Sequence, residues 1–162
     1  SGGTIAKLME AGIEIHYAVF SMCEKSIPAG YGPGAIKAEL IQVIDFFGIK
    51  KENVHLFDFE VRVFPQYRQD ILEEMVKLNN LIQPDIVFLP NSTDIHQDHF
   101  TIYQEGVRAF RYSRLLSYEL PWNNFVLLSN LYVTLKERHL KKKVDALKLY
   151  KTQSFRQYNN EE

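Results

Sequence analysis

The chain has 162 residues, of which 46% are hydrophobic and 24% charged, so we expect one globular domain over residues 1–162 with a substantial core. Its formal net charge of −1 at pH 7 excludes the basic excess that nucleic-acid-binding domains usually show. The single cysteine excludes an internal disulfide, and no secretory signal or apolar stretch of about 20 residues is evident, so we expect a cytoplasmic protein without a membrane span.

The chain opens with a predicted helix followed by a predicted strand. Residues 4–11 place apolar side chains at helical spacing, and Gly12 follows where a helix cap is expected. Residues 13–20 are β-branched and aromatic, which predicts a strand, and residues 21–34 form a loop rich in Gly and Pro. A helical pattern then returns over residues 35–49 and stops at Gly48.

The middle of the chain repeats this alternation. Residues 54–59 predict a short strand, and residues 65–82 predict a long helix with Pro65 in its first turn. Residues 85–90 form a continuous apolar run, which is typical of a parallel strand covered on both faces. Residues 99–110 return to a helical pattern.

The last third adds the segment 115–120, a Pro-Trp-Asn-Asn turn, a strand-like segment over residues 125–135 and a helix over residues 136–150. The basic cluster at residues 136–143 is best interpreted as a solvated helix face. Helices that alternate with strands predict an α/β domain with a mainly parallel sheet, in which ligands bind beyond the carboxyl ends of the strands.

The segment "NSTDIHQDHF", residues 91–100, lies at such an end. It places Asp94, His96, Asp98 and His99 within six residues, directly after the apolar strand. A spacing of three at a helix start puts both imidazoles on one side, and a neighbouring carboxylate such as Asp98 can accept a ring N–H and fix the tautomer. The cluster therefore predicts a metal or acid–base site, and its competitor is a capping and hydrogen-bonding role.

The other three histidines lie outside this cluster. His16 and His55 lie within or beside predicted strands, and His139 lies within a predicted helix. A lone histidine in such a place is usually a hydrogen-bonded structural residue, so we predict structural roles for all three.

At this point the sequence resembles the PIG-L/LmbE-like family of zinc-dependent N-deacetylases. "DIHQDH", residues 94–99, fits a pattern close to D-x-H-x-D-H, with Gln97 where proline is common. "GGTIAKLMEAGIEIHYAVF" is similar to the segment that follows the first motif of the family, and "LIQPDIVFLP" to the strand before the histidines. "KKKVDALKLYKTQ" resembles the late helix that ends in Tyr-Lys-Ser-Gln, with Thr152 in place of serine.

The resemblance implies a Rossmann-like three-layer α/β fold, and it also implies that part of the family domain is absent. The first family motif, close to Ala-His-Pro-Asp-Asp-Glu, would lie just before Ser1 and would supply the general base and two metal ligands. We therefore expect an internal fragment that lacks the first strand and the closing segment, and that is inactive by itself. The general base and two metal ligands cannot be assigned in this chain.

The resemblance also implies roles for the histidine cluster. It makes His99 a ligand of Zn²⁺, although another divalent metal such as Fe²⁺ is compatible, and it makes His96 and Asp98 catalytic residues. His96 would face the developing oxyanion or pass a proton to the leaving amine, and Asp98 would orient and charge-stabilise His96. The implied reaction removes acetyl from an N-acetylglucosamine-type amino sugar, free or in a glycoconjugate, within surface polysaccharide or glycoconjugate biosynthesis.

Candidate substrate-binding residues lie near the cluster or follow it. Tyr118 and Trp122 could stack on a sugar, and Glu119 or Asn123 could bond its hydroxyls, whereas the competing interpretation is a packed Trp in a turn. Arg68 could meet a phosphate, with surface ion pairing as its alternative. Asp94 completes this substrate-binding set.

Two other functions remain open from the sequence, and a homo-oligomer is compatible with any of the three. One is a non-catalytic sugar-binding or nucleotide-sugar-binding domain that has lost its metal motif. The other is an unrelated α/β transferase in which "DIHQDH" only caps a helix.

Overall fold

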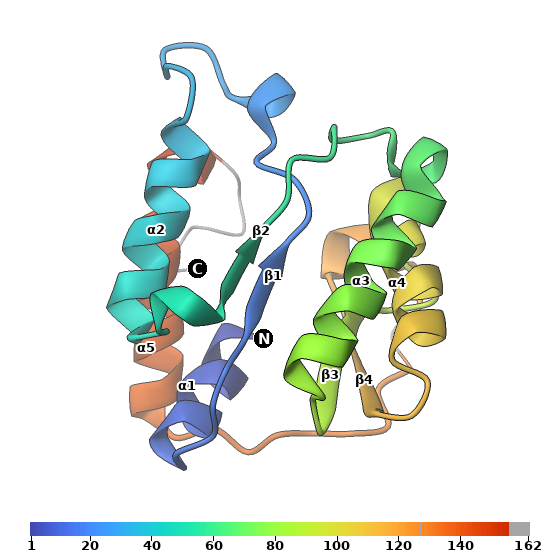
Figure 1. Cartoon of the computed structure of the whole chain (residues 1–162). Coiled ribbons are helices and arrows are strands. Elements are labelled where there is room, and N and C mark those ends of the chain that lie inside the picture. Colours follow the sequence, from blue (N-terminus) through green and yellow to red (C-terminus); the bar gives the residue numbers. More distant parts are fainter. Residues whose placement is uncertain (127, 156–162) are drawn as a thin grey trace. The chain divides into compact units, whose positions relative to one another are not determined.

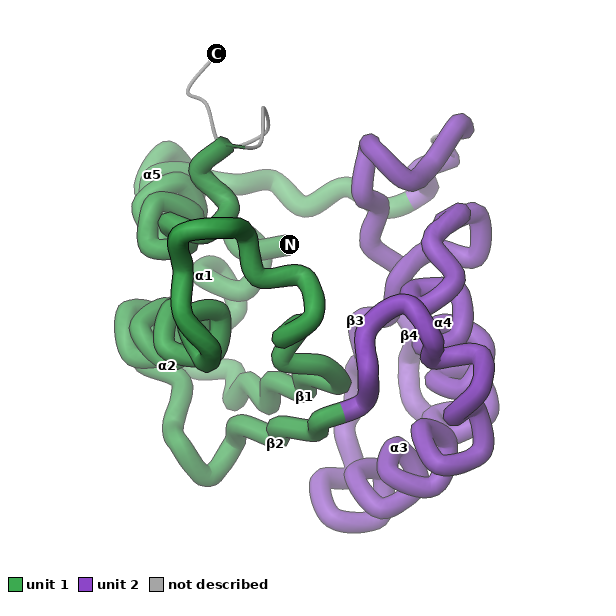
Figure 2. The backbone as a smooth tube through the Cα atoms, turned by 90° about the horizontal axis from the view of Figure 1, so that it is seen from above, with its two compact units in different colours: residues 1–58, 131–162 green, residues 59–130 purple. Residues whose placement is uncertain are grey.

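The computed structural model describes residues 1–126 and 128–155. Two pairs of parallel strands are hydrogen-bonded, β1 with β2 and β3 with β4, and helices lie beside each pair (Figure 1). The predicted α/β class with parallel strands is therefore confirmed. The chain divides into two compact units, residues 1–58 with the residues from 131 onward, and residues 59–130 (Figure 2). The prediction of one domain over residues 1–162 stays a prediction.

The first unit is built on the β1–β2 pair. The strands β1 (Tyr17–Val19) and β2 (Val54–Leu56) run parallel with Ala18 opposite His55. Its helices are α1 (Gly2–Glu10), α2 (Ala35–Phe47) and α5 (Glu137–Leu147), and α5 packs on both α1 and α2 (Figure 1). The buried apolar side chains of its core are Ala6, Met22, Leu40, Ile44, Phe47, Ile49 and Ala146.

The second unit is built on the β3–β4 pair. The strands β3 (Ile86–Pro90) and β4 (Arg114–Tyr118) run parallel in register, and α3 (Arg68–Ile82) packs on α4 (Gln97–Ala109). Helix α4 also packs on β3, so the strand that precedes the histidine cluster is held against the helix that follows it. The buried apolar side chains here include Phe64, Ile71, Leu72, Met75, Leu78, Leu89, Ala109 and Phe110.

The predicted strand over residues 13–20 is shorter than expected. Gly12, with a φ of +77°, ends α1, and the backbone N–H of Ile13 donates to the carbonyl of Leu8 at 3.0 Å. This 6→1 bond, with the Gly12 to Met9 bond beside it, is the Schellman arrangement that closes helices. Ile13 therefore belongs to the helix end, and only the residues opposite β2 form strand.

Two other strand predictions need correction. The strand expected over residues 125–135 is absent from its described residues, 125, 126 and 128–135, and residue 127 lies outside the description. Large apolar side chains in this segment, including Phe125, Leu128 and Tyr132, are exposed. The β3 strand forms as predicted but is covered on one side only, since Leu89 is buried whereas Ile86 and Phe88 are exposed. In the parts of the chain that are described, every helix is too short or too polar to cross a lipid bilayer.

Candidate functional site

The histidine cluster lies where the chain leaves two neighbouring parallel strands. Because Pro90 ends β3 opposite Tyr118 at the end of β4, the following loops emerge at the same edge. The loops are joined by a backbone hydrogen bond from Ile95 N–H to the carbonyl of Asn123 at 2.9 Å. A second bond runs from the Thr93 hydroxyl to the Asn124 side-chain oxygen at 2.7 Å. The two loops therefore form one surface of the second unit.

The two imidazoles of the cluster lie against each other. His96 is the N-cap of α4 and His99 is in its first turn, and their ring centroids are 4.6 Å apart with an interplanar angle of 27°. The sequence prediction that this spacing brings both rings to a common side agrees with this geometry.

His96 also performs the capping role that competed with the metal prediction. Its Nδ1 atom accepts the backbone N–H of Asp98 at 3.2 Å, which satisfies one of the donors at the start of α4. An accepting Nδ1 leaves Nε2 as the protonated nitrogen of the neutral ring. Burial, and then the neighbouring His99, lowers the pKa of His96 from its ordinary value, so the neutral form is favoured.

Asp94 is buried and contacts the His99 ring. Its side chain is 1% exposed, and its Oδ2 atom lies 2.8 Å from Nδ1 of the His99 ring. Its Oδ1 atom accepts the backbone N–H of His96 at 2.8 Å, and the Asn123 amide donates to Oδ2 at 3.4 Å. The carboxylate of Asp94 therefore contacts three other residues of the site.

Asp98 faces away from the loop surface toward the chain before α3. Its carboxylate accepts the backbone N–H groups of Arg62 at 2.5 Å and Phe64 at 3.1 Å. Arg62 has a φ of +77°, which is uncommon for a non-glycine residue, and the Gln97 side chain donates to its carbonyl. Asp98 meets His96 through its own backbone amide, whereas the described bonds of its carboxylate go to backbone groups.

The other predicted substrate-binding residues are distributed around this surface. Tyr118 ends β4, and Trp122 is 59% exposed. The Glu119 carboxylate accepts hydrogen bonds from Asn91 and Ser129. Arg68 begins α3 and pairs with Glu105, at 2.7 Å through Nε and 2.5 Å through one terminal nitrogen, which is the ion pairing that was its alternative.

Asn123 enters the site in a way that sequence reasoning did not anticipate. The sequence suggests its side chain only as a partner for sugar hydroxyls, whereas in the structure its amide nitrogen lies 3.2 Å from Nδ1 of His99. The Asn124 side chain donates to the carbonyl of Leu120 and so stabilises the turn. The only signal in the sequence was a pair of asparagines in a turn after a strand that runs parallel to β3.

The cluster offers one imidazole nitrogen that suits a metal ion. With Nδ1 of His99 beside Asp94, Nε2 is left to offer its lone pair, and a neutral imidazole is a common ligand of Zn²⁺. Residues 1–126 and 128–155 contain no group of three or more His, Cys, Asp or Glu side chains placed to hold a metal ion. His99 therefore fits one position of a zinc site, and the described chain does not complete that site.

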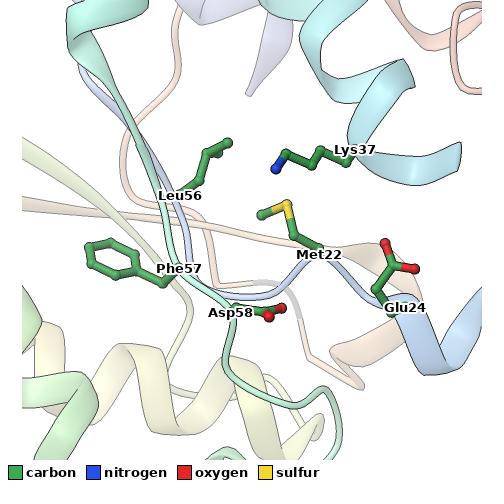
Figure 3. Close-up of a pocket in the computed structure, with 6 residues that line it drawn as sticks. All are labelled: Met22, Glu24, Lys37, Leu56, Phe57 and Asp58. Carbon is green, nitrogen blue, oxygen red and sulfur yellow. The ribbon is translucent and has the colours of Figure 1, made fainter. Parts of the chain in front are cut away.

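A separate hollow of about 260 Å³ lies in the first unit, beyond the carboxyl ends of β1 and β2. Figure 3 shows Lys37 reaching toward Met22 and Leu56, with the carboxylates of Glu24 and Asp58 nearby. The Glu24 carboxylate accepts the backbone N–H of Gly34 at 3.1 Å, which ties the loop to the start of α2. The hollow is open and lies in the unit that does not contain the histidine cluster.

Solved structures share this fold. The conserved protein TT1542 from Thermus thermophilus superposes with a TM-score of 0.78 at 19% identity, covering 97% of this chain and 74% of that one. The N,N'-diacetylchitobiose deacetylase from Pyrococcus horikoshii superposes with a TM-score of 0.72 at 19% identity, covering 94% and 64%. The zinc inhibited form of teicoplanin deacetylase Orf2 and the hydratase GalB from Pseudomonas putida KT2440 also match. At these identities the likeness establishes the fold alone.

The chain is also similar in sequence to a curated protein and to a family profile. The uncharacterized deacetylase YaiS of Escherichia coli strain K12 is 30% identical over 108 residues, which are 62% of this chain and 57% of that protein. The chain thus spans little more than half the length of this curated relative. The sequence profile of PIG-L, described as GlcNAc-PI de-N-acetylase, matches residues 1–110, which include β1, β2, β3 and the histidine cluster. The chain therefore belongs to the PIG-L family.

Proposed function

We propose that the protein is a zinc-dependent hydrolase that removes acetyl from the nitrogen of an N-acetylated amino sugar. The observation that supports this best is the pair of stacked imidazoles at the start of α4, because their described hydrogen bonds use only one nitrogen of each ring. His96 uses Nδ1 to cap the helix, and His99 uses Nδ1 toward Asp94, so each ring keeps Nε2 for chemistry. Membership of the PIG-L family supports the same reaction class.

His99 would hold the metal ion through Nε2. A bound Zn²⁺ lowers the pKa of its water toward about 7 and polarises the amide carbonyl. His96, neutral because its pKa is lowered, would donate its Nε2–H to the carbonyl oxygen as negative charge develops there. The same nitrogen would pass a proton to the leaving amine.

Asp98 would support this arrangement by fixing the start of α4. Its carboxylate accepts two backbone amides from residues 62 and 64, and its own amide holds the His96 ring. We propose that Trp122 and Tyr118 present aromatic faces to the sugar, that Glu119 bonds hydroxyl groups, and that Arg68 lies at the edge of the substrate surface.

The proposed substrate is an N-acetylglucosamine-type unit, free or within a glycoconjugate, handled in the cytoplasm during surface polysaccharide or glycoconjugate biosynthesis. The diacetylchitobiose deacetylase with the same fold supports a sugar amide as the class. The second candidate is a sugar-binding domain without catalysis. Zinc content and acetate release separate the two.

The division of roles between the histidines is tested in the protein as its gene encodes it. His99→Ala should abolish zinc retention and turnover, measured by metal analysis and by acetate release from N-acetylglucosamine derivatives. His96→Ala should retain zinc and lose turnover by about 10²-fold or more, because it removes a donor to the oxyanion. Equal zinc loss in both variants would show that the roles are not divided in this way.

The 162-residue chain gives a second test. Because its described residues offer His99 without two further ligands, we expect calorimetric titration of this chain with Zn²⁺ to show weak binding. We also expect the chain to release no acetate from N-acetylglucosamine derivatives. A tight stoichiometric site in this chain would mean that ligands were assigned wrongly. If the protein encoded by the gene has no zinc at all, the helix-capping interpretation of "DIHQDH" or the non-catalytic domain gains support.

A further inference from the structure

The contacts of Asp94 determine which nitrogen of His99 faces outward. We infer that Asp94, supported by Asn123, holds the neutral His99 ring with its proton on Nδ1, so that Nε2 is the atom presented to a ligand. The tautomer stands on geometry alone, whereas the use of Nε2 for a metal rests on the function proposed above. Asp94 thereby becomes a positioning residue instead of a substrate-binding one.

The donor and acceptor count supports this assignment. A carboxylate only accepts hydrogen bonds, so the 2.8 Å contact between Asp94 Oδ2 and Nδ1 of His99 requires the proton on the ring. The same Oδ2 atom receives the Asn123 amide at 3.4 Å, and Oδ1 receives the backbone N–H of His96 at 2.8 Å. The 3.2 Å between the Asn123 nitrogen and Nδ1 follows because two donors converge on one oxygen.

Asp94 and His99 differ in how far their side chains are exposed to solvent. The Asp94 side chain is 1% exposed, whereas the His99 side chain is 34% exposed. A carboxylate this far from water must be satisfied by protein donors, since an unpaired buried charge is strongly unfavourable. The Asp94 side chain is therefore too buried to contact a sugar, whereas the His99 side chain is partly exposed and can contact a ligand.

The backbone makes this arrangement rigid. Asn123 is tied to the loop after β3 through the bond from Ile95 N–H to its carbonyl, and Asp94 accepts the amide of His96 at the start of α4. A carboxylate that accepts the second nitrogen of a metal-binding histidine is worth about 10–100-fold in metal affinity or activity. The same magnitude is expected here for the loss of the Asp94 carboxylate.

The tautomer can be measured without metal or substrate. Imidazole ¹⁵N–¹H correlation spectra of the labelled chain, recorded at about pH 8, should show Nδ1–H for His99 and Nε2–H for His96. The two rings provide opposite references in one spectrum, because His96 uses Nδ1 as an acceptor. A His99 ring that carries its proton mainly on Nε2 in the unmodified chain overturns the inference.

Asp94→Asn supplies the matched change. The new amide keeps an oxygen for the His96 N–H but presents an N–H to His99, so the His99 ring should switch to Nε2–H, as carboxylate-to-amide changes beside a histidine do in the serine protease triad. The control is Asp70→Asn on the exposed surface of α3, which should leave both tautomers unchanged. If Asp94→Asn does not fold, the spectrum of the unmodified chain still decides the question.

Zinc affinity in the protein encoded by the gene separates this inference from the proposed function. Loss of about 10–100-fold in Asp94→Asn, with the tautomer switched, supports both. A switched tautomer with unchanged zinc affinity supports the role of Asp94 and shows that His99 is not a ligand. An unswitched tautomer with Asp94→Asn folded overturns the positioning role, whatever the metal result.

Discussion

The side chain of Leu89 lies directly against the α-carbon of Gly106, so that a methyl group added to that glycine would stand 2.5 Å from one Leu89 methyl carbon and 2.8 Å from the other. Leu89 is a buried residue of β3, and Gly106 is in the middle of α4. Any larger residue at this position of the helix that carries the histidines would force the buried Leu89 side chain to shift. This contact fixes the depth at which α4 lies on the sheet.

Gly106→Ala should therefore destabilise the protein by about 1 kcal/mol or more, measured by urea unfolding. Overpacking typically costs about 1–3 kcal/mol, and the better helix propensity of alanine offsets up to about 1 kcal/mol of it. Gly32→Ala, where the added methyl meets nothing within 4 Å, is the control and should change stability little. In a Leu89→Ala background, Gly106→Ala should cause no further loss of stability. If the losses of stability from the two changes simply add, the packing argument is contradicted.

The second prediction concerns Glu105, which is completely buried and pairs with the half-exposed side chains of Arg68 and Arg108. Replacing either arginine by Met should cost about 1 kcal/mol or less, because the other still pairs with the carboxylate and solvent screens both. Replacing both should cost about 3 kcal/mol, since a buried charge is left without either partner. Chemical denaturation checks this, and a double variant that loses no more than the sum of the singles would contradict it.

Thr152 allows a cleaner separation of hydrogen bonding from packing. Its hydroxyl donates to the buried Glu39 at 2.6 Å and its N–H donates to the other carboxylate oxygen at 2.9 Å. Thr152→Val keeps the shape and removes the hydroxyl, so a loss of about 1.5–3 kcal/mol is expected. Thr152→Ser keeps the hydroxyl and should cost about 1 kcal/mol or less. Similar thermal shifts for the two variants would show that packing dominates.

The fourth prediction is a dependence of stability on acid. The Arg138 and His139 side chains, through hydrogen bonds to Glu10, lower the pKa of Glu10 from its ordinary 4.5 to about 2. Because the folded pKa is the lower one, the stabilisation is present above about pH 4.5 and is lost as the pH falls toward 2.

Urea midpoints of the unmodified chain and of Glu10→Gln should therefore differ most near pH 6 and converge as the pH falls from about 4.5 toward 2. The gap should also narrow with added salt, because Glu10 and Arg138 are about half exposed. In an Arg138→Met background the pH dependence of the gap should be smaller. A gap that stays constant down to pH 3 would rule out this linkage.

Much of the fold was predictable because it depends on neighbours in sequence. The period of the apolar residues located α1, α2, α3, α4 and α5 to within a few residues, and the glycines at positions 12 and 48 marked helix ends. The side shared by His96 and His99 followed from their spacing at a helix start. These features need only local geometry.

The remaining features depend on residues that are far apart in the chain. The carboxylate of Asp98 accepts hydrogen bonds from backbone groups 34 and 36 residues earlier. Every residue except proline has a backbone N–H, so the sequence does not indicate which of them will be the donors. The Asn123 contact to His99 requires the parallel pairing of β3 and β4, which sets two loops side by side. The segment at 125–135 has strand composition, but a strand needs a hydrogen-bonded neighbour, and its described residues have none of strand type.

The exposed segment after the Pro-Trp turn has a practical consequence for handling this chain. Phe125, Leu128 and Tyr132 present apolar surface on backbone that, over its described residues, has no sheet partner, and a net charge of −1 provides little mutual repulsion between molecules. Preparations concentrated for spectroscopy should therefore self-associate near neutral pH. Glutamates introduced at these three positions should raise the concentration that remains monodisperse in light scattering.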